Sequence, residues 1–490
     1  MEHKHSMHKI IILNNKKCQF ISDDDGLVKK LHNHLSFKLN GIQYTPAYQN
    51  GWSGITYLLT KGNKFNYGLL NNVKQFLENK KEEYSIEDNR IAKIINSELD
   101  ISNNLKKYKL IPREHQIRIA DTACNVDRGI IRAATGAGKT LVTAMITARI
   151  NKPTIIYVIG LDLLDQFHKL FSKLFDEPIG YIGDGTCNIE RINIASIWTV
   201  GRSLKLDNII EDENGGNERD LDESNQAKIL KLLNNTKVHI FDESHVCSTN
   251  TIAEIYKNID PEYIYGFSGT PFRDDNSDLL INGILGEQII NVSASELIKL
   301  NLLAAPLIKF YTVPKMSVGN IYTAVYKEYI VENDIRNNLI AKLSKDLINK
   351  NYTPLVLFKQ IKHGETLFNK FQELDIKCAM LYGNDSLEKR NEVKAALINK
   401  EIELILASTI FDLGLDLPQL NALILSGGGS STIRALQRIG RTLRPYSGKK
   451  FAAIIDFYDQ VKFLKKHSMI RYKIYSSEDG FKVIKSKEMK

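Results

Sequence analysis

A short glycine-rich motif in this chain has the residue types and the spacing to hold a nucleoside triphosphate. Residues 134–140 read Ala-Thr-Gly-Ala-Gly-Lys-Thr, between the apolar residues 129–131 and a helix-like run over 141–150. Lys139 can reach the β- and γ-phosphates, and the hydroxyl of Thr140 can bind Mg²⁺. Backbone N–H groups of the loop can surround phosphate oxygens at Thr135, Gly136, Ala137 and Gly138. The motif therefore predicts a phosphate loop between a strand and a helix.

A second motif supplies two acidic side chains further along the chain. Residues 241–245 read Phe-Asp-Glu-Ser-His and follow the strand-like run 237–240. Asp242 can anchor the metal, and Glu243 can orient and deprotonate a water molecule. Alone, the glycine-rich motif could also be a helix-capping turn. Together and in this order, the two motifs predict a site for ATP hydrolysis at the carboxyl end of a parallel sheet.

Apolar runs that alternate with amphipathic segments predict the elements that position these motifs. In the first series, strands are expected at 154–159, 192–197, 238–241 and 264–268. In the second series, strands are expected at 355–358, 378–381, 404–407, 423–425 and 451–456. Strands that alternate with helices in this way are typical of parallel sheets. The expected fold class is α/β, with two tandem doubly wound parallel-sheet domains and a small N-terminal α+β domain.

The order of these and further motifs resembles the superfamily-2 helicases. Residues 113–116 read Arg-Glu-His-Gln, and residues 267–271 read Phe-Ser-Gly-Thr-Pro. Residues 407–418 read Ala-Ser-Thr-Ile-Phe-Asp-Leu-Gly-Leu-Asp-Leu-Pro, and residues 437–445 read Gln-Arg-Ile-Gly-Arg-Thr-Leu-Arg-Pro. Each string matches a helicase motif at the same place in the series. The resemblance implies two RecA-like domains that use ATP and Mg²⁺.

The resemblance also assigns roles to single residues. Gln116, close to Arg113, would read the adenine edge. The residues that would act on the nucleotide from the second domain are Gly414, Asp416, Gln437, Arg441 and Arg444. The two last arginines, three residues apart, would lie on one helix face, where guanidinium groups stabilise charge on transferring phosphoryl oxygens. ATP binding would then favour closure of the two domains, and hydrolysis would release it.

Contacts with a nucleic-acid strand are inferred from the same series of motifs. The residues in question are Gln166, Gly183-Asp184-Gly185, Ser196, Thr199, Lys359 and His363. Small and polar groups can contact backbone phosphates without reading bases. We expect these residues to line the path of a strand.

The N-terminal region has a composition that favours a polyanionic partner. Residues 26–77 contain lysines and many aromatic residues but no Asp or Glu. Lysines neutralise phosphates, and aromatic rings can stack on bases or fill a small core. Turn residues in this stretch predict short hairpins, followed by a helix near 68–80. Residues 81–106 are charged and helix-like, which predicts a helical connection to the first α/β domain.

Within this region, four strings resemble the accessory domain of the phage UvsW-type helicases. They are residues 37–41 (Phe-Lys-Leu-Asn-Gly), Pro46, residues 52–54 (Trp-Ser-Gly) and residues 67–69 (Tyr-Gly-Leu). Ser53 stands where that family often has Asp. The resemblance covers nearly the whole chain. It implies a DNA helicase that remodels forks, displacement loops and four-way junctions by branch migration, in phage recombination, repair and replication.

Other interpretations stay open at this point. An RNA helicase would carry the same motor motifs, because strand contacts go mainly to phosphate and sugar. A motor subunit of a restriction system and a non-catalytic nucleic-acid-binding protein are the further alternatives. Branched DNA is the expected partner. Because both halves of the ATP site lie on one chain, we expect a monomer.

Length and composition define the expected organisation. The chain has 490 residues, a net charge of +9 and five scattered cysteines. This predicts several domains, no disulfide framework, no membrane-spanning segment and a cytoplasmic location. The expected domains are an N-terminal domain over 1–105, two motor domains over 106–305 and 306–465, and a basic tail over 466–490. Residues 207–223 are expected to form an acidic, solvated insertion.

Overall fold

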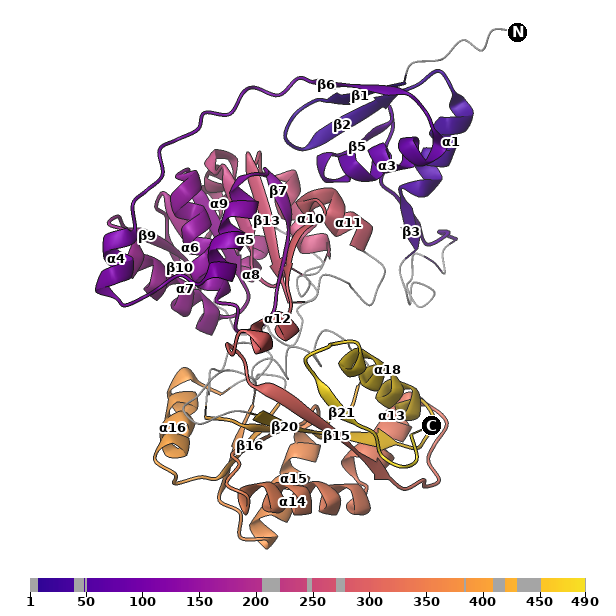
Figure 1. Cartoon of the computed structure of the whole chain (residues 1–490), viewed down its shortest axis with the longest axis vertical. Helices are drawn as coiled ribbons and strands as arrows, with labels where there is room; N and C mark the ends of the chain where they lie inside the picture. The colour runs from indigo at the N-terminus through magenta and orange to yellow at the C-terminus, as the bar shows by residue number, and fades with distance from the viewer. Residues whose placement is uncertain are drawn as a thin grey trace. The chain divides into compact units, whose positions relative to one another are not determined.

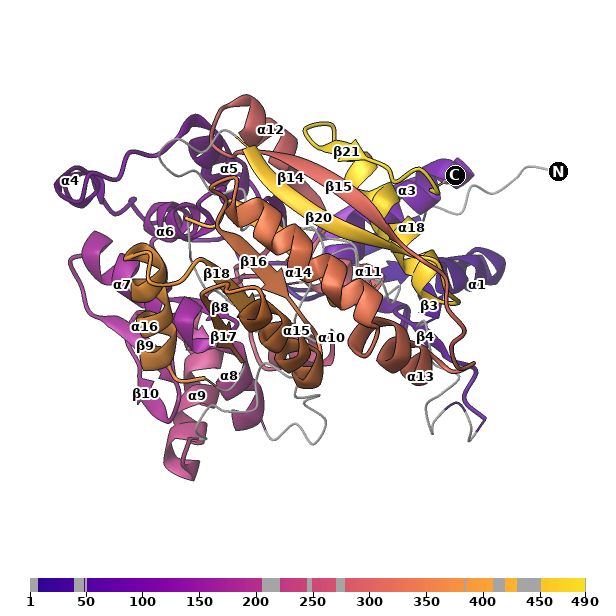
Figure 2. The same ribbon diagram turned by 90° about the horizontal axis from the view of Figure 1, so that it is seen from below.

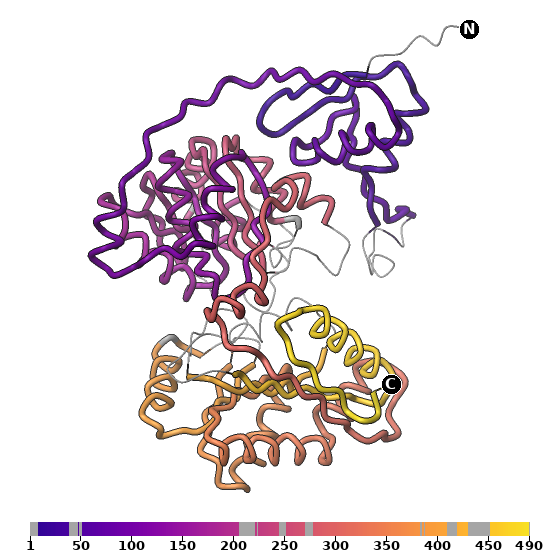
Figure 3. Tube along the Cα trace, viewed as in Figure 1, coloured from indigo at the N-terminus to yellow at the C-terminus, as the bar shows by residue number. Residues whose placement is uncertain are grey.

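The computed structural model of the chain describes nine stretches of residues (Figures 1 and 3). They are 8–38, 48, 51–204, 221–244, 249–269, 278–382, 385–408, 419–429 and 451–489. The chain divides into two compact units, one with residues 1–133 and 138–291, the other with residues 134–137 and 292–490. No helix among the described residues is long and apolar enough to cross a membrane.

The N-terminal sheet belongs to the first unit and has four strands in the order β5-β2-β1-β6. Its strands are β1 (His8–Ile12), β2 (Lys17–Ile21), β5 (Lys64–Asn66) and β6 (Tyr84–Asp88). Residues along β1 alternate between buried and half-buried, as expected for a strand with one covered face. The helices α1 (Asp25–His34) and α3 (Leu70–Lys80), the 3₁₀ turn η2 (Tyr67–Leu69) and the hairpin β3 (Ser36–Lys38)–β4 (Ile55–Tyr57) complete this region.

The connection after this sheet is not the helix that the sequence predicted over 81–106. Residues 84–88 instead form β6, which pairs in parallel with β1. Residues 89–101 have no regular structure and run as a long extended trace to α4 (Ser102–Lys107) (Figure 1). The alternation of apolar and polar residues in Tyr84-Ser85-Ile86 is compatible with a strand as well as a helix. Pairing with β1 stabilises the strand.

The larger sheet of the first unit has eight strands in the order β10-β9-β11-β8-β12-β13-β7-β14. The strands are β7 (Arg128–Ala133), β8 (Thr154–Val158), β9 (Ile179–Gly183), β10 (Thr186–Asn188), β11 (Ile192–Ser196), β12 (Val238–Phe241), β13 (Tyr263–Ser268) and β14 (Gln288–Val292). The inner strands from β9 to β7 pair in parallel, and β10 is an antiparallel addition. The strands predicted for the first series are confirmed.

Helices cover both faces of this sheet (Figures 1 and 2). They are α5 (Glu114–Cys124), α6 (Lys139–Ile150), α7 (Leu161–Leu174), α8 (Ile197–Ser203), α9 (Glu223–Asn235), α10 (Thr249–Lys257) and α11 (Asp278–Leu285). α6 is apolar on nearly all sides and is buried along most of its length, because the sheet and its neighbouring helices surround it. This arrangement is the doubly wound fold that the sequence predicted.

The second unit contains a seven-stranded sheet in the order β17-β18-β16-β19-β20-β15-β21. Its strands are β15 (Ala305–Val313), β16 (Pro354–Leu357), β17 (Cys378–Leu381), β18 (Leu404–Ala407), β19 (Ala422–Leu425), β20 (Phe451–Asp459) and β21 (Lys482–Ile484). All of these neighbours pair in parallel. The strands predicted for the second series are therefore confirmed, and their carboxyl ends share one edge of the sheet.

The second unit also contains helices and two buried ion pairs. Its helices are α12 (Ala294–Lys299), α13 (Tyr322–Tyr326), the π-helical turn η3 (Lys327–Val331), α14 (Asp334–Ile348), α15 (Ile361–Glu373), α16 (Leu387–Ile398) and α18 (Leu464–Ser476). Arg336 of α14 donates a hydrogen bond to Asp459 over 3.1 Å. Arg471 of α18 forms a bidentate ion pair with Asp456, and both of its hydrogen bonds are 2.8 Å long. Residues 466–490, which the sequence set apart as a basic tail, contain most of α18 and the edge strand β21.

Candidate nucleotide-binding site

The phosphate-loop motif follows β7 and leads directly into α6. Two of its glycines have backbone conformations that other residues rarely adopt, with φ +92° at Gly136 and +79° at Gly138. A Cβ on Gly138 would lie 2.1 Å from Nε2 of Gln116, and a Cβ on Gly136 would lie 2.7 Å from Cδ2 of Leu303. Both positions therefore favour glycine for conformation, and a Cβ at either one would also displace the end of a neighbouring side chain.

The acidic motif follows β12, at the same edge of the sheet as the end of β7. Only β13 lies between these two strands, and all three run in parallel. Lys139, in the first turn of α6, forms an ion pair with Glu243 and lies 3.8 Å from Oδ1 of Asp242. The topology thus brings the cation and the two carboxylates that the sequence predicted into one cluster. The side chains of all three are mostly buried.

Gln116 connects the upstream motif to the phosphate loop. Its Oε1 accepts a hydrogen bond of 2.9 Å from the backbone N–H of Arg113, which closes the first turn of α5. The side chain is 4% exposed, and its Nε2 faces Gly138. The side chain of Gln116 therefore lies beside the loop that it was predicted to serve.

Ser244 is a residue of this site that the sequence analysis did not single out. Its N–H and its Oγ both donate to the carbonyl oxygen of Phe267 near the end of β13, over 2.9 and 3.2 Å. The acidic motif is thus tied to the strand that carries the 267–271 motif. A serine directly after Asp242-Glu243 was the signal that could have indicated it.

The residues present fit a triphosphate and a divalent cation. The loop exposes backbone N–H groups at the amino end of the α6 helix, where phosphate binds favourably. Asp242, Glu243 and the Thr140 hydroxyl are oxygen donors, which are the ligands that Mg²⁺ prefers. Thr135 is a further loop position whose N–H group can contribute. Ala137, which was also predicted to contribute, is buried, and its N–H donates to the carbonyl oxygen of Ala134 over 3.0 Å. Gly414, Asp416, Gln437, Arg441 and Arg444 lie outside the described residues, as do the acidic residues 207–220.

Several predicted strand contacts have other roles in the structure. Ser196 caps α8 by accepting a hydrogen bond from the N–H of Thr199, and both side chains are buried. His363 is also buried and bonds Oδ1 of Asn337 over 3.0 Å, and burial lowers the pKa of His363 to about 3. The structure therefore does not place these three side chains at a surface that a strand could reach. Gln166 and Lys359 are exposed, Gly183 ends β9, and Asp184 and Gly185 form the turn to β10.

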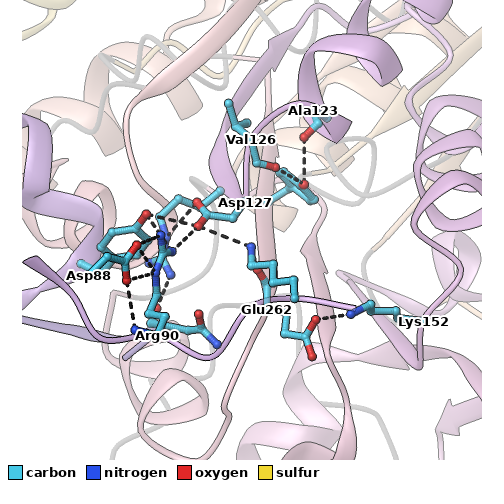
Figure 4. Close-up of polar contacts among 12 residues, drawn as sticks. Asp88, Arg90, Ala123, Val126, Asp127, Lys152 and Glu262 are labelled. Atoms are coloured by element: carbon cyan, nitrogen blue, oxygen red, sulfur yellow. Dashed lines mark hydrogen bonds and ion pairs between the residues drawn. The ribbon is translucent and has the colours of Figure 1, made fainter. Parts of the chain in front are cut away.

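A polar cluster joins the N-terminal sheet region to the amino edge of the eight-stranded sheet. In Figure 4, Arg90 points toward Asp127, which directly precedes β7. Nη1 of Arg90 donates to Asp127 over 2.7 Å and to the hydroxyl of Tyr67 over 2.9 Å. The Tyr67 ring lies near two guanidinium groups, 4.7 Å from that of Arg90 and 4.3 Å from that of Arg128. We call Tyr67, Arg90, Asp127 and Arg128 the Tyr67 clasp.

Electrostatics and close packing both support the Tyr67 clasp. Burial raises the pKa of Asp127, but Lys93, Arg128 and Arg90 lower it by more, so the carboxylate stays ionised. Burial and the charge of Asp127 raise the pKa of Tyr67 to about 12. Next to it, Gly68 packs so closely on α11 that a Cβ would lie 2.2 Å from the carbonyl oxygen of Asn282. The N-terminal sheet region is therefore docked at the edge opposite the phosphate loop.

Comparisons with known families match three successive stretches of the chain. A model of the UvsW DNA helicase N-terminal region matches residues 13–87. A model of the type III restriction enzyme res subunit matches residues 109–273, and one of the helicase conserved C-terminal domain matches residues 337–446. These stretches correspond to the N-terminal sheet region and to parts of the two parallel-sheet units.

Individual helicases are similar to this chain along most of its length. The ATP-dependent DNA helicase uvsW of Enterobacteria phage T4 is 24% identical over 515 residues, covering 95% of this chain and 97% of that protein. Putative helicase 22 of Sulfolobus islandicus filamentous virus is 23% identical, covering 77% of this chain and 70% of that protein. The structure of S. cerevisiae Dbp5 bound to RNA and ADP BeF3 is 13% identical, covers 79% of this chain and 94% of Dbp5, and has a TM-score of 0.55. That likeness shows the fold, two RecA-like domains.

Proposed function

Since the chain belongs to the superfamily-2 helicases and carries a UvsW-type region ahead of its two RecA-like domains, we propose that it moves branch points in DNA. It is an ATP-dependent helicase. The observation that supports branched DNA is the match of residues 13–87 to the UvsW N-terminal model, together with similarity to a phage DNA helicase along 95% of the chain. Forks, displacement loops and four-way junctions are the substrates we infer.

Lys139 and Glu243 have linked roles in the mechanism. Their ion pair keeps both charges neutralised before the triphosphate binds. When ATP·Mg²⁺ binds, it supplies the phosphoanhydride to be cleaved and the positive charge that polarises it. Lys139 then exchanges its carboxylate partner for β- and γ-phosphate oxygens, and Glu243 becomes able to take a proton from the attacking water. Thr140 and Asp242 are the side chains that would hold the metal.

Other residues complete the proposed ATP site. Arg113 and Gln116 would hold the adenine, and the loop from Thr135 to Gly138 would hold the phosphates. From the second RecA-like domain, the residues proposed to act on the nucleotide are Gly414, Asp416, Gln437, Arg441 and Arg444. The last two would supply positive charge to the transferring phosphoryl group. Their motif order supports these roles.

The direct test compares ATP-dependent remodelling of a synthetic four-way junction with unwinding of a simple partial duplex. We expect faster processing of the junction, because branch migration exchanges base pairs rather than melting them. Equal or faster activity on the partial duplex would contradict branch migration. An RNA duplex in the same assay separates an RNA helicase from a DNA helicase. We propose a monomer, because both halves of the proposed ATP site lie on one chain. Relatives from a phage and a virus support a location in the cytoplasm of an infected host cell.

A Lys139→Ala variant tests the assignment of the phosphate loop. Loss of the cation that contacts the phosphates should lower DNA-stimulated ATP hydrolysis by about 10²-fold or more, while DNA affinity stays the same. A Lys231→Ala variant, which removes an exposed lysine of α9, is the matched control. Full hydrolysis by Lys139→Ala would show that the loop is misassigned.

A further inference from the structure

An exposed group of lysines surrounds an aromatic ring at the carboxyl edge of the seven-stranded sheet. An open pocket there is lined by Lys315, Gln460, Val461, Lys462, Phe463, Lys465, Lys466 and Met469. Lys315 follows β15, and the other residues follow β20 and begin α18. None of these lining residues is acidic. We call the four lysines and Phe463 the lysine patch.

The charges of the lysine patch are not neutralised by carboxylates in the described parts of the chain. All four lysine side chains are exposed, and the nearby Asp459 is buried and paired with Arg336. Nζ of Lys462 lies 3.5 Å from a backbone carbonyl oxygen and 5.1 Å from the centre of the Phe463 ring. Like charges gathered in this way repel one another, so an anion that binds all of them gains attraction and relieves repulsion.

The basic surface extends beyond the pocket along the same sheet edge. Lys359 follows β16, and its backbone N–H lies 3.1 Å from where a Cβ on Gly427 would be, so it borders the end of β19. Burial lowers the pKa of His467 most, and the charges of Arg471, Lys466 and Lys359 lower it further. The charges of Lys359 and Lys466 therefore act on one side chain. An extended polyanion would contact these lysines in succession.

Phe463 is held in an unfavourable conformation at the centre of this surface. Its φ is +64° and its ψ is −53°, which are rare for a bulky residue. The ring is 36% exposed and packs edge-on with Tyr322 of α13, at 6.0 Å between centroids and 82° between planes. Strained residues of this kind persist where the surroundings hold them, and they cluster at binding sites. The Phe463 side chain therefore lies partly exposed at the surface, in a backbone conformation that few residues adopt.

We propose that the lysine patch binds the phosphate backbone of a single-stranded nucleic-acid segment and that Phe463 stacks on one of its bases. Lysines bind phosphates as point charges, and an aromatic ring can stack on any base, because every base has a π-face. The combination fits a single strand better than a duplex, whose bases are already stacked. This inference rests on the proposed function, and it assigns the second RecA-like domain a strand contact outside the helicase motifs.

Removal of the lysines tests the electrostatic part. We expect the variant Lys462→Ala/Lys465→Ala/Lys466→Ala to bind a labelled oligothymidine about tenfold or more weakly in fluorescence anisotropy. The slope of the logarithm of its binding constant against the logarithm of the salt concentration should become less negative by about 0.7 for each lost phosphate contact. The matched control is Lys342→Ala/Lys350→Ala/Lys377→Ala. It removes three exposed or half-exposed lysines of the same unit, two of which precede β16 and β17 at the opposite sheet edge. Equal salt dependence in the two variants would overturn the inference.

Phe463→Gly tests the stacking part with little change in stability. Glycine adopts positive φ readily, and this gain offsets the lost packing on Tyr322, so thermal stability should stay close to that of the unaltered protein. Affinity for the oligothymidine should fall by about fivefold or more, while affinity for a blunt duplex stays constant. Unchanged affinity for the single strand would overturn the role of Phe463, and so would an equal loss for duplex and single strand.

Failure of this inference is distinguishable from failure of the proposed function. If the unaltered protein binds no DNA and DNA does not stimulate its ATPase, both fail. If the unaltered protein binds DNA and the patch variant binds it equally well, only the lysine patch is wrong. ATP hydrolysis in the absence of nucleic acid should be the same in the patch variant as in the unaltered protein.

Discussion

Gly138 shows how much of the site could be predicted from single residues. The glycine-rich motif and the acidic motif together predicted a phosphate loop, because few other structures need both patterns in this order. The contact between Gly138 and Nε2 of Gln116 could not be predicted, since the two residues lie on different elements and meet only in the folded sheet. The burial of His363 could not be predicted either, because its position after a strand is also typical of an exposed residue that contacts nucleic acid.

A Gly138→Ala substitution tests this contact. The left-handed φ and the 2.1 Å approach to Gln116 should together lower the free energy of unfolding and weaken ATP binding. Gly62→Ala is the matched control, because Gly62 has φ +77° but nothing within 4 Å of the added Cβ. We expect Gly138→Ala to cost about 1–3 kcal/mol more than Gly62→Ala. Thermal denaturation and nucleotide titration measure both effects.

The double variant Gly138→Ala/Gln116→Ala separates strain from crowding. Removal of the Gln116 amide should restore part of the lost stability, because the added methyl group then has space. If the double variant is no more stable than Gly138→Ala, the two residues do not contact each other as described.

At the scale of elements, strands were predicted better than connections. Central strands such as β8 and β16 are buried on both faces and read as short continuous apolar runs bounded by turns. The segment 81–106 was misjudged, because its charged composition suits a helix and its partner strand β1 lies far away in the sequence. The helix and strand within residues 466–490 were not predicted for a similar reason, since β21 is a strand only by pairing with β15.

The strand that ends at the acidic motif has a buried histidine that should make its stability depend on pH. His239 of β12 bonds the Tyr157 hydroxyl over 2.9 Å, and burial lowers the pKa of His239 to about 3. Between pH 6.5 and 3 the unfolded chain binds a proton here that the folded chain does not. Stability should therefore fall as pH falls below 6.5, by about 1.4 kcal/mol per pH unit for this residue.

A His239→Gln variant measures this contribution. It should be less stable at neutral pH, and its free energy of unfolding should change less between pH 6.5 and 5.5. Fluorescence of Trp198, which is buried in α8, reports on this sheet if Trp52 is replaced by Phe. Parallel pH profiles for the variant and the Trp52→Phe background would contradict the assignment.

At the scale of the whole molecule, the order of the parts was predictable and their attachment was not. Motif order placed a UvsW-type region before two parallel-sheet domains, and the matched families agree. The Tyr67 clasp escaped prediction, because Tyr67 and Asp127 lie 60 residues apart and neither belongs to a motif that implies the other. The contact between these residues is apparent only in the folded structure, where the two sheets lie side by side.

A double-mutant cycle tests whether the Tyr67 clasp fixes the N-terminal region. Arg90→Gln and Asp127→Asn should each increase protease cleavage within residues 89–101, and their effects on stability should be coupled by about 0.5–3 kcal/mol. The control cycle uses Arg149→Gln and Asp121→Asn, a more exposed ion pair in the same unit, for which we expect about 0–1 kcal/mol. Coupling no larger than in this control would mean that the clasp does not hold the region in place.

Because the clasp lies at the amino edge of the eight-stranded sheet and the proposed catalytic carboxylates lie at the carboxyl edge, attachment and hydrolysis would have separate structural requirements. An N-terminal region from a related helicase could be grafted onto this motor wherever its counterpart of Tyr67 meets Asp127 and Arg128. Such a chimera would inherit the substrate preference of the donor and the ATPase of the recipient. Substrate choice would then be a transferable module in this molecule.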